Sequence, residues 1–156
     1  MGGKLQSEIR QQKPFVSREE EVFLNILRTA ESLIWGLAET LKPAGLTPTQ
    51  YNVLRILRGA GAAGLACREI AERMVTKDSD ITRLLDRLEN QKLVKRSREQ
   101  ADRRVVMTFI TNDGRRILKA LDEPVMKLHG RQLGHLGERR LRAFLESLEA
   151  AREGRG

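Results

Sequence analysis

The feature that most constrains this chain is an apolar stripe that recurs at helical spacing through residues 17–41. Its members are Val22, Phe23, Ile26, Leu27, Ala30, Leu33, Ile34, Leu37, Ala38 and Leu41. Ser17 followed by Glu20 is the pattern of a capping box, in which each side chain accepts a hydrogen bond from the other residue's backbone amide. Pro43 and Gly45 end the pattern. The stripe predicts one amphipathic helix of about two dozen residues, roughly twice the average length, which needs a large apolar surface to cover it.

Composition indicates a single basic domain. The chain has 156 residues, of which 40% are hydrophobic, enough to bury a core, but only 4% are aromatic. Lysine and arginine number 29 against 21 acidic residues, which gives a net charge of +8 and favours an anionic partner, either nucleic acid or a membrane surface. The single cysteine excludes an intramolecular disulfide framework and a cysteine-rich zinc site, and it suits a reducing cytosol.

Residues 1–16 are polar and unpatterned, and we expect a loose or partner-held arm. The first twenty residues carry Lys4, Glu8, Arg10 and Lys13 without an apolar run, so we expect no signal peptide. No apolar stretch approaches the roughly 18 residues of a membrane span. The expected location is therefore the cytoplasm, with no membrane partner.

Start and stop signals divide the middle of the chain into short helices. Thr47-Pro48-Thr49-Gln50 opens a helix that Gly59 is expected to end, and a loop of small residues follows over 60–64. A helix over 66–74 is expected to bury Ile70, Ala71 and Met74. After a turn at 75–78, a helix over 78–90 has Ile81, Leu84, Leu85 and Leu88 on one face. Two short helices joined by a tight turn indicate a helix-turn-helix.

The periodicity then changes to that of strands. Residues 93–98 and 104–110 are β-rich runs separated by a turn at 99–103, which predicts a hairpin with a basic tip. Thr111 is expected to cap a helix that runs towards Arg131 and is kinked at Pro124. A last helix over 138–151 places Leu141, Phe144, Leu145 and Leu148 on one stripe.

The order of elements predicts a mainly α fold with a small β-hairpin wing. The whole chain, 1–156, is interpreted as one domain, in which a winged helix-turn-helix over 47–111 is flanked by helices within 17–46 and 112–153. The outer helices carry more apolar face than so small a middle can cover. A second copy of the chain is the expected cover, so we expect a homodimer.

The polar face of the helix over 78–90 is the candidate for reading DNA. A recognition helix contacts base edges mainly through its first turns. We therefore assign base contacts to Ser79, Thr82 and Arg83, with Arg83 suited to a bidentate contact with guanine. Asp78 and Asp80 are candidate acceptors, and Lys77 is a candidate phosphate contact. The alternative is that Arg83 and Arg87 only solvate the helix against Asp80 and Asp86.

The hairpin adds a cluster of positive charge. Six basic residues, against two acidic ones, lie between positions 91 and 104: Lys92, Lys95, Arg96, Arg98, Arg103 and Arg104. Such a hairpin beside a polar helix predicts a surface that follows phosphates and probes the minor groove. The alternative is a solvated hairpin whose charges protect a strand edge. The full expected interface is Lys77, Asp78, Ser79, Thr82, Arg83, Arg87, Lys95, Arg96, Arg98, Asp102, Arg103 and Arg104.

Three segments carry a resemblance to a known family. They are Leu88-Glu89-Asn90-Gln91-Lys92-Leu93-Val94-Lys95-Arg96, then Asp102-Arg103-Arg104, then Thr111-Asn112-Asp113-Gly114-Arg115. Together they resemble the winged-helix signature of the MarR family of transcriptional regulators, over roughly residues 17–152. The resemblance implies a homodimer joined by its terminal helices, which commonly represses transcription until a small ligand weakens DNA binding.

The resemblance also assigns a role to the wing. By position, Asp102 would orient Arg104, which would enter the minor groove. The two residues lie two apart, so on an extended strand their side chains would project to the same side. The family usually has glycine where this chain has Lys92, and a left-handed residue there costs a side chain on the order of 1 kcal/mol.

A few other residues are candidates for chemistry. Cys67 stands where a helix N-terminus can activate a thiol; the redox-sensing branch of the family uses a cysteine near the start of the first long helix, however, so a buried structural cysteine is favoured. His129 and His135 lack the neighbours of a metal site. Trp35 and Tyr51 either line an effector pocket or belong to the core.

No catalytic arrangement is recognisable, so we expect no enzyme, no cofactor and no metal. The favoured hypothesis is a regulator that binds a pseudo-palindromic operator in double-stranded DNA as a homodimer and is released by a small aromatic or phenolic effector. The competing hypothesis is a winged helix used for protein interaction or as a non-specific architectural DNA binder. DNA selected from a random pool would separate the two.

Overall fold

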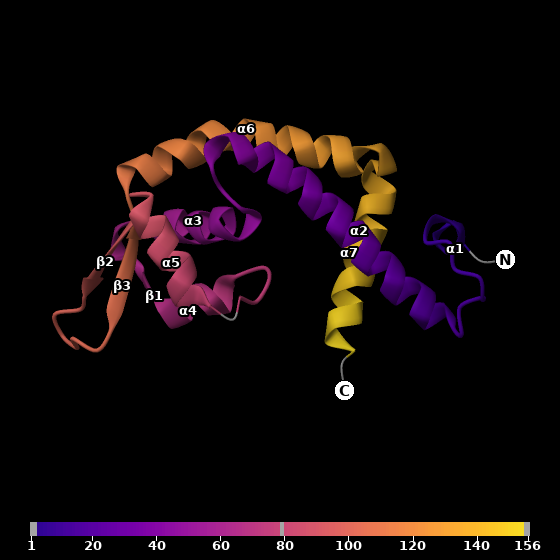
Figure 1. Ribbon diagram of the computed structural model, residues 1–156, viewed down its shortest axis with the longest axis horizontal. Helices are drawn as coiled ribbons and strands as arrows, with labels where there is room; N and C mark the ends of the chain where they lie inside the picture. Colours follow the sequence, from indigo (N-terminus) through magenta and orange to yellow (C-terminus); the bar gives the residue numbers. More distant parts are fainter. Residues whose placement is uncertain (1–2, 79, 155–156) are drawn as a thin grey trace.

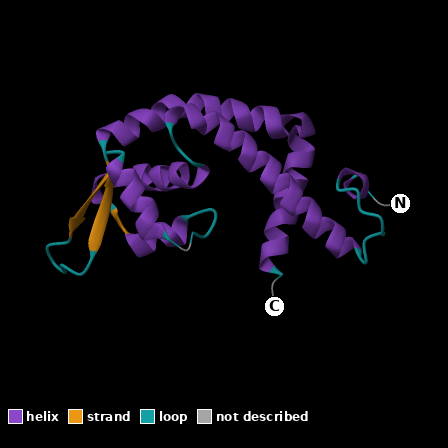
Figure 2. Cartoon of the chain, viewed as in Figure 1, coloured by secondary structure: helices purple, strands orange, loops and turns teal. Residues whose placement is uncertain are grey.

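A computed structural model describes residues 3–78 and 80–154, in which helices dominate and the strands gather at one end (Figures 1 and 2). The helices are α1 (Leu5–Glu8), α2 (Arg18–Leu41), α3 (Pro48–Ala60), α4 (Cys67–Arg73), α5 (Ile81–Asn90), α6 (Asn112–Leu133) and α7 (Gly137–Glu153). The strands are β1 (Leu65–Ala66), β2 (Val94–Arg98) and β3 (Val106–Ile110), and short 3₁₀ turns occupy Lys42–Ala44, Gly61–Ala63 and Gly134–Leu136. The predicted fold class, mainly α with a small β-hairpin wing, is confirmed.

The molecule consists of a lobe and a helical arm. The lobe contains α3, α4, α5 and the sheet, and the arm contains α2, the second half of α6 and α7 (Figure 1). Helix α6 arches from the lobe to the far end of the arm and continues without a break through Pro124 (Figure 1). Helix α7 then turns back across α2 (Figure 1).

Local sequence signals explain where the helices start. The Thr47 hydroxyl accepts a hydrogen bond from the Gln50 amide, and the Gln50 side chain accepts one from the Thr47 amide, which completes the predicted capping box with Pro48 in the first turn. At α2 only half of the box forms. The Ser17 hydroxyl accepts from the Glu20 amide, but the Glu20 carboxylate accepts from Val16, one residue earlier than predicted.

The core of the lobe is made of aliphatic side chains. Those that are almost fully enclosed include Leu54, Leu57, Ile70, Leu88 and Leu118. They come from α3, α4, α5 and the first half of α6, so α6 belongs to the core of the lobe as well as to the arm. This common core fixes α5 against the sheet, and thereby sets where its outer face lies.

The sheet has three antiparallel strands in the order β1-β3-β2. In the hairpin, Val94 pairs with Ile110 and Arg98 pairs with Val106. The third strand is the short β1, where Leu65 pairs with Thr108. The sequence did not predict β1, because two residues are too few to show a strand's alternation.

Several predicted boundaries and burials need correction. Helix α5 starts at Ile81 rather than at position 78, because Asp80 occupies the capping position. Gly59 lies inside α3 rather than ending it, and Ala71 is exposed. Residues before α2 are not all loose, since Leu5 of α1 is buried and Glu8 pairs with Arg28 of α2 at 3.2 Å.

The arm exposes large apolar side chains on all three of its helices, with Met126 on α6. On α2 these include Val22, Phe23, Ile26 and Trp35, and on α7 they are Phe144 and Leu145. This agrees with the expectation that the outer helices carry more apolar surface than one chain covers. Among the described residues, no helix is long and apolar enough to cross a membrane.

A glycine at the start of α6 allows the sheet to approach closely. A Cβ atom at Gly114 would lie 2.5 Å from the carbonyl oxygen of Leu93 and 2.7 Å from Cγ1 of Ile110. We expect Gly114→Ala to lower the free energy of unfolding by about 1–3 kcal/mol, because backbone and core must shift to make room. Urea unfolding at a fixed protein concentration measures the change.

The matched control is Gly130→Ala in the same helix, where an added Cβ meets no described atom within 4 Å. This change should raise the free energy of unfolding by about 0.5–1 kcal/mol, because alanine favours a helix over glycine. Equal effects of the two substitutions would show that the close approach at Gly114 is unimportant.

Candidate nucleic-acid interface

Helix α5 presents one apolar and one polar face. Ile81, Leu84, Leu85 and Leu88 are buried, as predicted, and the outer face carries Thr82, Arg83, Asp86, Arg87 and Asn90, all exposed. The turn before the helix carries Lys77, which is also exposed. Ser79, predicted to contact bases, lies outside the described residues.

The two aspartates before α5 have structural roles. The Asp80 carboxylate accepts a hydrogen bond from the Arg83 amide at 3.1 Å and so caps the helix. The Asp78 carboxylate accepts from the Asp80 amide at 2.8 Å and closes the preceding turn. One oxygen of each carboxylate thus accepts from a backbone amide that lacks a helical partner, and the predicted acceptor role of Asp78 and Asp80 towards DNA stays a prediction.

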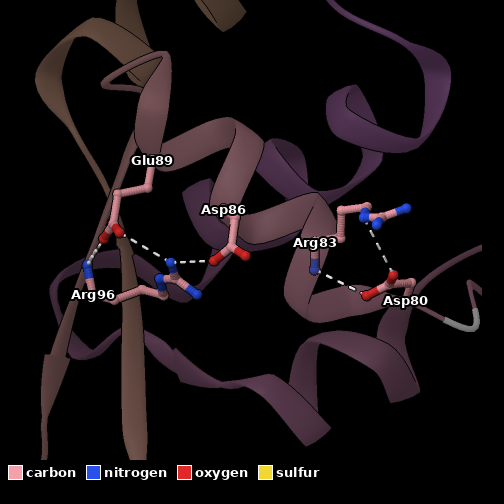
Figure 3. Close-up of polar contacts among 5 residues, drawn as sticks. All are labelled: Asp80, Arg83, Asp86, Glu89 and Arg96. Carbon is pink, nitrogen blue, oxygen red and sulfur yellow. Dashed lines mark hydrogen bonds and ion pairs between the residues drawn. The ribbon is translucent and has the colours of Figure 1, made fainter.

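Arg83 remains available to a ligand. Its Nε atom lies 3.7 Å from Asp80, while 72% of its side chain is exposed (Figure 3). Such a surface ion pair is worth at most about 1 kcal/mol, so it is readily exchanged for another acceptor. The pairing of Arg83 with Asp80, which the alternative interpretation expected, and the outward position of Arg83 are both observed.

Arg96, predicted to contact DNA, points instead at α5. Its guanidinium contacts the carboxylates of Asp86 (2.5 Å) and Glu89 (3.0 Å), and its amide donates to the second oxygen of Glu89 at 3.1 Å (Figure 3). Only 22% of the Arg96 side chain is exposed. The hydrogen bond from Arg96 lowers the pKa of Glu89, so the pair stays ionised. We call Asp86, Glu89 and Arg96 the helix–wing clamp.

The sequence did not single out Glu89. The spacing of Asp86 and Glu89, three residues apart, places both carboxylates on one side of the helix. Their distance from Arg96, however, depends on how the chain turns between α5 and β2. That turn uses Lys92 in a left-handed conformation (φ 62°), as predicted. The Lys92 carbonyl accepts from the Thr111 hydroxyl at 2.8 Å, which ties the turn to the start of α6.

At the tip of the wing, Asp102 holds Arg104. The Asp102 carboxylate accepts from the Arg104 amide at 3.0 Å and from its Nε atom at 3.3 Å. The pairing agrees with the expectation, but its geometry differs: the residues lie in a turn before β3, which starts at Val106 and not at Arg104. The hydrogen bonds to Asp102 orient the Arg104 side chain. Because this side chain is 92% exposed, it remains accessible to a ligand.

The remaining cations of the wing surround this pair. Lys95, Arg98 and Arg103 are exposed, and Arg98 donates to the carbonyl of Arg103 at 2.8 Å across the hairpin. Thr82 of α5 and Arg104 of the wing line the same cavity, of about 350 Å³. The start of α5 and the wing therefore border one concave surface.

Comparison with known proteins identifies the family. The family model of the MarR family matches residues 46–106. The crystal structure of a MarR transcription factor from Planctomyces limnophilus has 39% identity and a TM-score of 0.68, covering 88% of this chain and 99% of that one. This chain belongs to the MarR family.

Two further proteins are similar to this MarR-family chain. The HTH-type transcriptional repressor MdtR of Bacillus subtilis (strain 168) is 40% identical over 78 residues, which are 50% of this chain and 49% of MdtR. The match thus spans about half the length of that relative. The structure of a mutant MarR from Escherichia coli complexed with operator DNA has 23% identity and a TM-score of 0.80, covering 89% of this chain and 99% of that one, a likeness of fold. The family consists of transcription regulators rather than enzymes, as the sequence indicated.

Trp35 and Tyr51 lie in different environments, and the effector pocket predicted for them stays a prediction. Tyr51 is buried in the core of the lobe, where burial raises the pKa of its phenol, whereas the Trp35 side chain is 68% exposed on the arm. A cavity of about 590 Å³ between α2, α6 and α7 is lined by other residues, including Leu33, Arg140 and Phe144. The described residues contain no cluster of three or more His, Cys, Asp or Glu side chains able to hold a metal.

Cys67, in the first turn of α4, is half-buried, and this burial raises the pKa of its thiol, against a smaller opposing effect of Arg96. A raised pKa lowers the thiolate fraction at neutral pH, and the thiolate is the reactive form. We therefore expect the pH profile of alkylation by iodoacetamide to have its midpoint above that of an ordinary cysteine. Mass spectrometry of the alkylated protein gives the rates.

The control is the same profile in concentrated urea, where the midpoint should return to about 8.5, the value of an unperturbed thiol. A folded-state midpoint at this value would contradict the raised pKa, and one well below it would identify Cys67 as an activated thiol and restore the redox hypothesis.

Proposed function

We propose that this chain binds a pseudo-palindromic operator as a homodimer and represses transcription until a small aromatic or phenolic effector releases it. The observation that carries the proposal is the concave surface bordered by Thr82 and Arg104, with the exposed polar face of α5 on one side and a preoriented arginine on the other. A recognition helix in the major groove with a wing reaching the adjacent minor groove fits this arrangement. The E. coli relative complexed with operator DNA has the same fold.

Direct readout is assigned to the first turn of α5. Thr82 and Arg83 are exposed there, and an arginine side chain can donate two hydrogen bonds to guanine. Lys77, Arg87, Lys95, Arg98 and Arg103 are assigned to phosphates, because they are exposed cations that flank this turn and the wing. Arg96 is removed from the DNA-contact set because both of its neighbouring carboxylates already hold it.

The homodimer is supported by the apolar surface of the arm. Phe23, Trp35 and Leu145 expose between 59% and 68% of their surface. Large exposed apolar side chains gathered on one arm favour an interaction surface. A two-fold axis through the arm would place two copies of α5 about one DNA turn apart, roughly 10 base pairs between half-site centres.

The effector is supported by space and by charge. The cavity of about 590 Å³ between α2, α6 and α7 is lined by Leu33, Phe144 and Arg140, and by Arg28, which pairs with Glu8 at 3.2 Å. This volume is typical of a small-ligand site, and Arg140 suits an acid or phenolate. A thermal-shift screen of small aromatic acids and phenols tests the effector, since a ligand that binds the folded dimer raises its apparent stability.

Selection from a random DNA pool tests the function itself. The proposal expects recovery of a pseudo-palindrome whose half-sites are about one turn apart. Recovery of only A·T-rich sequence would indicate a non-specific architectural binder. Recovery of nothing would indicate a protein-interaction module.

The wing yields a sharp prediction about charge. Arg104→Ala should weaken operator binding and flatten the preference for A·T pairs at the flanks, because a narrow minor groove attracts arginine. The slope of log affinity against log salt should fall by roughly one phosphate equivalent per wing. Asp102→Ala should reproduce part of the affinity loss, since it frees the arginine that it orients, although it removes a negative charge.

Glu99→Ala is the matched control for Asp102→Ala. Glu99 is an exposed carboxylate of the same loop, and its backbone amide, which the substitution keeps, donates to Val105. Its loss should leave affinity unchanged or slightly higher. If Asp102→Ala instead binds as tightly as Glu99→Ala at every salt concentration, the wing acts only as a patch of positive charge. Fluorescence anisotropy with labelled operator measures all three variants.

The dimer prediction concerns α7. Leu145→Asp should convert the protein to a monomer at micromolar concentration and weaken operator binding with it, because the change would bury an unpaired charge. Ala143→Asp is the control, since Ala143 is exposed on the opposite face of α7. Analytical ultracentrifugation reports the oligomeric state. A wild-type monomer at these concentrations, or equal effects of both substitutions, would refute the proposed interface.

A further inference from the structure

The helix–wing clamp adds a polar contact between the two parts of the interface, beside the apolar core that α5 and the hairpin share. Asp86 and Glu89 lie on successive turns of α5, and Arg96 is the third residue of β2, the first strand of the wing (Figure 3). Two side-chain contacts and one backbone hydrogen bond connect α5 with β2 here. The carboxylates of Asp86 and Glu89 are themselves half-exposed, at 52% and 40%.

The contacts of the clamp restrict the movement of Arg96 relative to α5. A guanidinium donates in a rigid plane, so contacts to two carboxylates restrict both its position and its tilt. Charge-assisted hydrogen bonds are shorter and stronger than neutral ones, and the low exposure of Arg96 limits screening by water. The pair Arg83–Asp80 on the same helix differs, with one contact at 3.7 Å and an Arg83 side chain that is 72% exposed.

The clamp also determines what Arg96 offers to DNA. Its single positive charge faces two negative ones, so a DNA phosphate approaching it would have to displace carboxylates that already hold the guanidinium. Within the described part of the chain, Arg104 pairs with Asp102 alone, and its side chain is almost fully exposed. Arg96 and Arg104 therefore have different roles.

We infer that Arg96 is a positioning residue: through Asp86 and Glu89 it fixes the wing against α5, so that helix and wing meet the DNA in one register. The inference rests on the proposed function, in which α5 enters the major groove and Arg104 the minor groove. A wing that pivots freely would lose rotational freedom on binding, and this cost would reduce what Arg104 contributes. The effect of Arg104 on affinity should therefore depend on the clamp.

A double-mutant cycle tests this dependence. Operator affinity is measured for the parent, Arg104→Ala, Arg96→Gln and the double variant. Loss of Arg104 should reduce affinity by about 5- to 150-fold in the parent. In the Arg96→Gln background, the same loss should be smaller by about threefold or more, which lies within the range of coupling between interacting residues.

A second cycle, with Arg83→Ala in place of Arg104→Ala, is the matched control. Arg83 lies on α5 itself and reaches DNA without the wing, so its loss should have the same effect with and without the clamp. Coupling confined to Arg104 supports the positioning role. Coupling of equal size to both arginines would indicate a general loss of folding, and additivity in both cycles would overturn the inference. Thermal unfolding of each variant identifies any that fails to fold.

A further variant neutralises the two carboxylates of the clamp and keeps Arg96. Asp86→Asn combined with Glu89→Gln preserves the shapes of both side chains and removes two negative charges from the interface. Simple electrostatics expects tighter binding, yet the contribution of Arg104 should fall as it does in Arg96→Gln. If this variant leaves the contribution of Arg104 unchanged, the ion pairs do not position the wing.

Salt dependence separates positioning from a phosphate contact. Arg96→Gln should leave the slope of log affinity against log salt close to that of the parent, because Arg96 releases no counterions in the proposed complex. A slope that falls by about one phosphate equivalent per wing would instead assign Arg96 to the DNA backbone. These outcomes are distinct from failure of the proposed function, which appears as a parent protein that selects no operator, or as an Arg104→Ala variant without effect.

Discussion

The packing of α6 against α3 is the contact on which the rest of the molecule depends. Leu118 is fully enclosed in the core of the lobe, and Leu121 and Val125 follow it on the same face of α6. Alongside this apolar contact, the Arg58 guanidinium makes two hydrogen bonds of 3.0 Å to the Asp122 carboxylate. Because α6 continues into the arm, these contacts transmit the orientation of the lobe to the apolar faces of α2 and α7. The angle between the proposed DNA-binding surface and the proposed dimer surface is thus set inside one chain.

Acidic residues organise an interface whose net charge is positive. Asp80 caps α5, Asp86 and Glu89 hold the wing, and Asp102 orients Arg104. Each carboxylate lowers the positive charge available to attract phosphate, so each has an electrostatic cost. The carboxylates instead hold the cationic side chains in position. A long cationic side chain that is already held in place loses less conformational entropy on binding. Affinity for an anion and placement of cations are therefore supplied by different residues.

Much of the fold could be predicted from short-range signals. Thr47, Pro48 and Gln50 specify the start of α3 without help from other elements, and the spacing of Ile81, Leu84, Leu85 and Leu88 specifies the buried face of α5. The pairing of Asp102 with Arg104 could also be predicted, because it joins residues two positions apart. A turn rather than a strand brings the two side chains together. The start of α5 was misplaced because acidic residues before a helix suit both its first turn and its cap.

Long-range relationships were the part that the sequence could not supply. Arg96 looks like any other cation of a basic hairpin until the turn at Lys92 brings β2 back along α5 and places it beside Asp86 and Glu89. Strand β1 exists only because β3 passes beside Leu65, and Trp35 and Tyr51 separate into surface and core only once α2 and α3 are packed. The sequence by itself determined the helices, the hairpin, the basic character of the interface and the surplus of apolar surface, because these depend on residues that are near neighbours in the chain. Only the tertiary structure decided which cations are held and which are free, because that depends on distances between elements that no local pattern encodes.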